Sequence, residues 1–292
     1  MANLVPLKSA WVFTRHVFML KTRILTVVII LPLFLVALFY LPEIFWAALL
    51  LSLTVTGSRE WCGLAQFSVQ NTIIYMLLTA LVGGELLFLL SEAVQIDMYS
   101  PIFTWIYVFS FVFWIIGAPL FLRQSQPIKN PILLMLVGWL LLLPTCLALY
   151  QIHAISPLLL LGFMATIWIS DTAAYFTGRT FGKHKLAGVI SPGKTWEGVA
   201  GALVAVLIYG LIWGQMVEGD SITMMLVPLL LLMTFLGIVG DLFESLMKRH
   251  AGVKDSGNIL PGHGGILDRI DALTSTLPVA ILALLIFYSP KL

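Results

Sequence analysis

The sequence has 292 residues, of which 60% are hydrophobic and only 10% are charged. Soluble proteins average roughly 25% charged residues, so this chain has too little polar surface to cover a water-soluble core. This excludes an ordinary cytosolic enzyme, a disordered chain and a secreted disulfide scaffold. The formal net charge of +2 is too small for a surface that binds nucleic acid. The composition therefore predicts an integral membrane protein.

Nine apolar stretches approach the roughly 20 residues that a helix needs to cross the hydrocarbon core. They are Ile24–Leu41, Ile44–Gly57, Thr72–Leu90, Pro101–Leu122, Pro131–Tyr150, Ile155–Gly178, Gly198–Val217, Ile222–Ser245 and Ala272–Tyr288. The second stretch is short, and the first contains Pro32. None alternates between apolar and polar residues as a barrel strand does. We predict an all-α polytopic membrane protein with about nine transmembrane helices.

The basic residues indicate which side of the membrane each loop faces. With a cytoplasmic N-terminus and about nine crossings, every Lys and Arg except Lys291 falls on the cytoplasmic side, as the positive-inside rule requires. In a bacterium this would be the inner membrane. Two long cytoplasmic loops, 179–197 and 247–271, lie in the C-terminal half and are rich in Gly, Pro and charge. Irregular backbone beside a membrane is expected where it lines a site.

These patterns divide the chain into two predicted regions. Residues 1–154 form an N-terminal transmembrane region that contains the first five helices. Residues 155–292 form a C-terminal catalytic region that contains the last four helices and both long loops. We expect the active site on the cytoplasmic face of the second region.

The first long loop contains the segment Gly188–Thr195, which fits the phosphate-loop pattern GxxxxGK[ST]. That pattern acts between a strand and a helix of a soluble α/β domain, and Pro192 removes one N–H group that would bind phosphate. We therefore reject a true phosphate loop. A weaker hypothesis is that Lys194 and Thr195 hold a phosphate at the start of a helix that begins near Trp196.

A polar helix face follows the eighth predicted span. It carries two carboxylates, a hydroxyl and a cation at i, i+3, i+4 and i+7 spacing: Asp241, Glu244, Ser245 and Lys248. Asp268 and Asp271 follow a Gly-rich break and begin the last span. Unpaired, an Asp at mid-bilayer costs roughly 2.5–3.5 kcal/mol, and a divalent cation would remove that cost. Hard oxygen ligands favour Mg²⁺, so we predict that Asp241 and Asp268 ligate it.

Four basic residues surround these acids, and we expect them to bind phosphates: Lys248, Arg249, Lys254 and Arg269. Each of them alone is also explained as an ordinary topology determinant, and Asp268 as a helix cap. His263, between glycines, is also explained as a turn residue. Their combination within one short stretch is much harder to explain in that way. Asp171, late in the sixth span, is either a hydrogen-bond partner within the membrane or a wall of the same cavity.

The segment Ser245-x-Met-Lys-Arg-x4-Lys-Asp-x-Gly-x2-Leu-Pro-x-His-Gly-Gly-Ile-x-Asp-Arg-Ile-Asp271 resembles the signature of the phosphatidate cytidylyltransferases (CDP-diacylglycerol synthases). Ser191-Pro-Gly-Lys-Thr-Trp-Glu-Gly198 and Ser170-Asp-Thr-Ala-Ala-Tyr175 resemble two further motifs of that family. Family members often have a second Lys where Gly193 stands, which puts one phosphate contact in question. The resemblance covers about residues 170–271.

The resemblance implies the reaction CTP + phosphatidic acid → CDP-diacylglycerol + pyrophosphate, with Mg²⁺ as the cofactor. It is compatible with a second cation and with a homodimer, and it implies membrane lipids but no nucleic acid as partners. The implied catalytic residues are Asp241, Asp268, Asp271, Lys248, Arg249, Lys254, His263 and Arg269. The implied substrate-binding residues are Ser191, Lys194, Thr195, Asp171, Gly264 and Gly265.

Three alternatives remain open at this stage. A related nucleotidyltransferase could act on another lipid phosphate. An ion-coupled transporter would also carry membrane carboxylates, but it predicts an inverted repeat with charges near mid-bilayer in both halves, whereas the cluster of acids and bases here lies at one end of the C-terminal half. A non-enzymatic scaffold gives no reason for a His-Gly-Gly turn between Asp residues.

Overall fold

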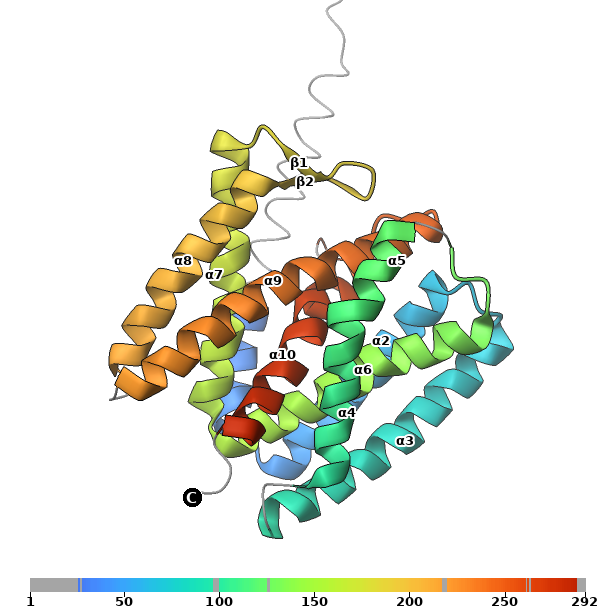
Figure 1. Cartoon of the computed structure of the whole chain (residues 1–292). Helices are drawn as coiled ribbons and strands as arrows, with labels where there is room; N and C mark the ends of the chain where they lie inside the picture. The colour runs from blue at the N-terminus through green and yellow to red at the C-terminus, as the bar shows by residue number, and fades with distance from the viewer. Residues whose placement is uncertain are drawn as a thin grey trace, which may run out of the picture.

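The structure is a computed structural model that describes residues 26, 28–96, 100–124, 127–216, 220–260, 262 and 264–287. Its described part is a bundle of α-helices with one small β-hairpin at one end (Figure 1). After a short helix, Val28–Tyr40, the elements are α2 (Glu43–Leu64), α3 (Val69–Ile96), α4 (Pro101–Val112), η1 (Phe113–Gly117), α5 (Ala118–Gln124), α6 (Pro131–Ile155), α7 (Pro157–Phe181), β1 (Lys185–Ala187), β2 (Ser191–Thr195), α8 (Trp196–Met216), α9 (Asp220–His250) and α10 (Leu267–Phe287).

Seven helices in the described part of the chain are long and apolar enough to cross a membrane, which supports an all-α polytopic membrane protein. They correspond to the third to ninth predicted spans, with α4, η1 and α5 forming one of them. The predicted count of nine is not confirmed. The helix Val28–Tyr40 is short, and the start of the first predicted span lies outside the described residues. The second predicted span lies within α2, whose C-terminal half carries Arg59 and Glu60 and is less apolar.

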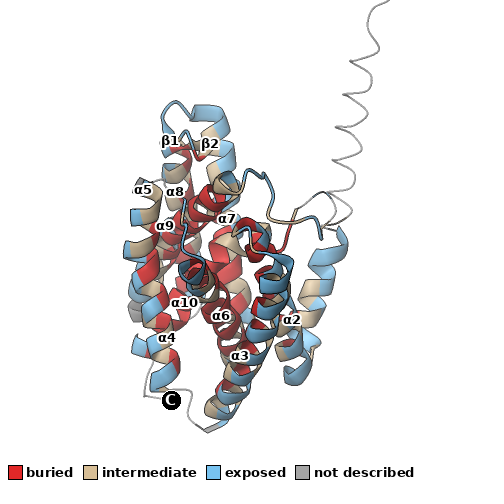
Figure 2. Ribbon diagram, turned by 90° about the vertical axis from the view of Figure 1, so that its right-hand side faces the viewer, coloured by how far each residue is buried: buried red, intermediate tan, exposed pale blue. Residues whose placement is uncertain are grey.

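α10 is the central helix of the bundle. In the most apolar 18-residue stretch of α10, 67% is buried, whereas in the corresponding stretch of α8 only 22% is buried. Figure 2 shows the buried residues on α6, α9 and α10 and the exposed residues on the outer faces of α2 and α3. A Cβ on Gly240 of α9 would lie 2.7 Å from the carbonyl oxygen of Asp271 on α10. This glycine therefore lets α9 and α10 pack closely, and the acids at the hairpin end of both helices come together.

An aromatic cluster supports the opposite face of α9. The π-helical turn η1 presents Phe113 and Trp114, whose ring centroids lie 5.5 and 5.8 Å from that of Phe243. Phe121 of α5 completes the cluster, at a centroid distance of 6.2 Å. Phe243 is fully buried, and it stands two residues beyond Asp241. The π-helical turn thus contributes two aromatic side chains to the surface against which this face of α9 packs.

The hairpin continues the α7–α8 pair. Glycine allows these helices to pack closely, since a Cβ on Gly198 of α8 would lie 2.9 Å from the carbonyl oxygen of Ala174 on α7. β1 and β2 pair in antiparallel fashion, so the segment predicted to be a loop at 179–197 is partly regular. Thr195 caps α8 by accepting a hydrogen bond from Gly198 N, and α8 begins at Trp196 as predicted. Residues 191–195 are an extended strand, which agrees with the rejection of a phosphate loop.

Candidate active site

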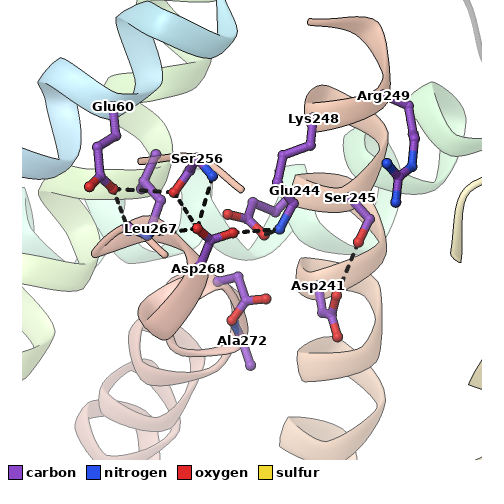
Figure 3. A network of polar contacts seen from close by, with 12 residues as sticks. Glu60, Asp241, Glu244, Ser245, Lys248, Arg249, Ser256, Leu267, Asp268 and Ala272 are labelled. Atoms are coloured by element: carbon purple, nitrogen blue, oxygen red, sulfur yellow. Dashed lines mark hydrogen bonds and ion pairs between the residues drawn. The ribbon is translucent and has the colours of Figure 1, made fainter. Parts of the chain in front are cut away.

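The polar face predicted for α9 exists, and it carries two rows of side chains (Figure 3). In one row, Ser245 Oγ donates to Asp241 Oδ1 at 3.2 Å. In the other, Lys248 Nζ lies 2.5 Å from Glu244 Oε2. Both pairs are four residues apart, so they are neighbours on the helix surface. The second row points toward the start of α10.

Asp268, in the first turn of α10, joins that helix to α9 and to the loop between them. Its Oδ1 lies 2.7 Å from Lys248 Nζ. Its Oδ2 accepts hydrogen bonds from Ser256 N at 2.8 Å, from Ser256 Oγ at 2.9 Å and from Gly265 N at 2.8 Å. The side chains of Asp268 and Lys248 are only 5% and 12% exposed. Asp268 is therefore a buried anion whose oxygens are already held by several donors.

The hairpin contacts α9 at the same end of the bundle. Lys194 Nζ of β2 lies 2.5 Å from Asp241 Oδ2, and Arg249 Nε donates to the carbonyl oxygen of Ile190 at 3.3 Å. Asp171 on α7 and Asp271 on α10 both interact electrostatically with Asp241 and with Lys194. Residues from four elements therefore form one cluster of acids and bases, to which Asp171 belongs.

The other predicted residues lie around this cluster. Lys254 and Arg269 are exposed, one in the loop and one in the first turn of α10. Ser191 is half-buried in β2, and the hydroxyl of Thr195 is used in the α8 cap. Gly264 has φ +84, and a Cβ there would lie 2.6 Å from Asp268 Oδ2. His263 lies outside the described residues.

Two residues of this network belong neither to the predicted polar face of α9 nor to the predicted site residues. Ser256 supplies two donors to Asp268, and Glu60 of α2 accepts hydrogen bonds from the start of α10. Glu60 lies far outside residues 170–271, the part of the chain that carries the family resemblance. The sequence did indicate that Glu60 needs a partner, because a carboxylate in an apolar helix is costly without one.

The donor set fits a hard cation. Carboxylate oxygens dominate it, and these are the ligands that Mg²⁺ prefers. Glu244 Oε1 is buried and has no hydrogen-bond partner within the described part of the chain, as an oxygen reserved for a cation would. As the side chains stand, no three His, Cys, Asp or Glu residues among those described form a ready metal site. A cation here would need water or substrate oxygens to complete its coordination.

The model of the cytidylyltransferase family matches residues 21–287. A protein of Haemophilus influenzae is 33% identical over 282 residues, covering 89% of this chain and 96% of its own length. One of Pseudomonas aeruginosa is 37% identical over 268 residues, covering 89% and 95%. One of Staphylococcus saprophyticus is 50% identical over 113 residues, covering 39% and 44%. All three are named phosphatidate cytidylyltransferase.

Proposed function

We propose that this chain, which belongs to the cytidylyltransferase family, transfers a cytidylyl group from CTP to phosphatidic acid and so makes CDP-diacylglycerol and pyrophosphate. The observation that carries the proposal is the convergence of basic and acidic side chains from α7, β2, α9 and α10 at one end of a bundle of membrane-length helices. The names of the relatives that match almost their whole length support the same reaction.

The position of the site suits one substrate in the membrane and one in water. The cluster lies at the helix ends, beside the exposed hairpin. The flanking helices present exposed apolar side chains, such as Phe176 and Trp196, which could border a lipid chain. By the positive-inside rule we propose that this end faces the cytoplasm, where CTP is available, and that in a bacterium the membrane is the inner one.

The reaction brings two phosphate-bearing anions together. A phosphate oxygen of phosphatidic acid forms a bond to the α-phosphorus of CTP, and the bond from the α-phosphorus to the bridging oxygen of pyrophosphate breaks. The attacking phosphate is already anionic near pH 7, since a phosphomonoester has a second pKa of about 6. No general base is required, so the protein's main task is to position the substrates and stabilise charge.

The basic residues are proposed to perform that task. Lys194 comes from the hairpin and Arg249 from α9, and each already makes an ionic or polar contact that a phosphate could replace. Lys254 and Arg269 are exposed and can meet the phosphates as they enter. Asp171 is proposed as a further wall of the cluster, since it interacts electrostatically with Asp241 and with Lys194.

Asp241 and Asp268 remain the proposed ligands of Mg²⁺, with Asp271 beside them or just outside the coordination sphere. Asp241 holds Lys194 through one oxygen, and Asp268 would become available to the ion if Lys248 left its Oδ1. The ion would neutralise the phosphate charge of CTP and of the leaving pyrophosphate.

The decisive experiment is an assay of the purified protein with labelled CTP and phosphatidic acid, with other lipid phosphates in parallel. We expect labelled CDP-diacylglycerol as the main product. Turnover only with another lipid phosphate would favour a related nucleotidyltransferase, and no turnover with any of them would refute the proposed reaction.

Removing divalent metal should stop the reaction reversibly. Because carboxylates dominate the cluster, we expect EDTA to abolish turnover and an excess of Mg²⁺ to restore it. Turnover measured before EDTA, after EDTA and after adding Mg²⁺ checks this expectation. Full activity in EDTA would contradict a metal requirement.

His263 is proposed to position a phosphate and not to act as an essential base, since the attacking phosphate is already ionised. We expect His263→Ala to retain activity within about 10–100-fold of the unchanged protein, the range for loss of a positioning contact. The steady-state rate at saturating CTP is the measurement. Complete loss in a folded variant would assign His263 an acid–base role.

A further inference from the structure

Glu60 lies near the C-terminal end of α2 and is only 5% exposed. Its Oε1 accepts a hydrogen bond from Ile266 N at 3.0 Å, and its Oε2 accepts one from Leu267 N at 2.8 Å. Ser256 Oγ also lies 3.3 Å from Oε2. These contacts join α2 to a segment about 200 positions later in the chain (Figure 3).

The partners of Glu60 include backbone groups that no helix can satisfy by itself. Leu267 is the first residue of α10, and the first N–H groups of a helix lack intrahelical acceptors. A carboxylate at this position makes charge-assisted hydrogen bonds and also interacts favourably with the helix dipole. Glu60 thus caps α10 from another helix and fixes where that helix begins.

Two glycines make room for the Glu60 carboxylate. A Cβ on Gly257 would lie 2.4 Å from Oε1, and a Cβ on Gly265 would lie 2.5 Å from Oε2. No side chain larger than hydrogen fits at either position unless Glu60 moves. The loop between α9 and α10 is therefore built around this carboxylate, and Gly265, predicted to bind substrate, serves this packing as well.

The same contacts lead directly to the candidate active site. Ser256 contacts Glu60 through its hydroxyl, and it donates from both N and Oγ to Asp268 Oδ2. Asp268 in turn holds Lys248 through Oδ1. We propose that Glu60 is a positioning residue for the reaction: it sets the place of Asp268, and through it Lys248, without touching either substrate.

The test rests on the proposed function, because its main measurement is cytidylyl transfer. In Glu60→Gln the amide group must face backbone donors, so the start of α10 and Asp268 shift. We expect kcat to fall about 10–100-fold, the usual cost of losing a residue that orients a catalytic group, with KM for CTP changed less than about threefold. Glu60→Asp keeps the charge and should recover part of kcat.

A matched control separates positioning from a purely structural cap. Asn130 caps α6 by accepting from Ile132 N and Leu133 N, and it lies outside the candidate site. Asn130→Ala should lower the thermal midpoint without changing kcat well below that midpoint. If Glu60→Gln behaves in the same way, or if KM rises while kcat is unchanged, the positioning role is refuted.

Ser256→Ala provides the second variant in case Glu60→Gln fails to fold. It leaves the α10 cap intact and breaks only the side-chain link between Glu60 and Asp268. We expect kcat to fall about tenfold, which is the lower end of the same range; unchanged kcat would refute the proposal. These outcomes are distinct from failure of the proposed function, in which the unaltered protein itself would not turn over CTP.

Discussion

Asp241→Asn and Asp268→Asn are each expected to lower turnover at least about a thousandfold, equivalent to about 4 kcal/mol of transition-state stabilisation. Each substitution removes one negative charge and keeps the shape of the side chain. In Asp241→Asn, Lys194 loses the partner that lies 2.5 Å away, and the proposed Mg²⁺ loses a charged ligand. Turnover of CTP by purified protein of confirmed fold is the measurement.

The appropriate control is an acid-to-amide change elsewhere in the bundle. Glu85 is exposed on α3, and Glu85→Gln should leave turnover within about twofold of the unchanged protein, as expected for a surface substitution away from the site. Near-normal activity of either Asp variant would remove that residue from the proposed metal site. Loss of activity in all three variants would instead indicate general damage from removing a membrane acid.

Local periodicity made the α9 face predictable from the sequence. The spacing of Asp241, Ser245 and Lys248 depends only on the α-helical repeat, and the hydrogen bond and ion pair four residues apart confirm it. The start of α8 was predictable for the same reason, because a Thr cap and the helix that follows it are adjacent in sequence. The apolar lengths of the last seven spans are likewise local properties.

Contacts between distant segments were not predictable in this way. Nothing in the local pattern around Glu60 indicates that its carboxylate meets Ile266 and Leu267, because this depends on how α2 packs against α10. The hairpin was missed because its two strands are short and because β2 contains a Pro and a Gly, which are depleted in strands. The pairing of Lys194 with Asp241 depends in turn on the hairpin.

The same difference between local spacing and long-range packing applies to the two proposed metal ligands. Both Asp241 and Asp268 lie in the cluster, as expected, but each is paired with a different lysine. Sequence spacing gives the identity of the acids and bases at the site. Only the packing of α9 against α10 and the hairpin determines which base neutralises which acid.

Lys248→Met is expected to be the most destabilising substitution in the site. Lys248 lies between Glu244 and Asp268, at 2.5 and 2.7 Å, and both carboxylates have side chains only 5% exposed. Removing the cation leaves two buried carboxylates without their common partner, and loss of one member of a buried ion pair typically costs about 3–5 kcal/mol. The thermal midpoint of the protein in detergent should fall clearly, and turnover should be lost.

A compensating change tests this cause. In Lys248→Met with Glu244→Gln, one of the two unpaired charges is removed, so we expect part of the thermal stability to return while turnover stays absent. Lys254→Met is the matched control, because Lys254 is exposed and its loss should leave the midpoint unchanged. If Lys248→Met were as stable as the unchanged protein, the buried ion pairs would not hold α9 and α10 together, and the neutralisation of Asp268 would have to come from another group.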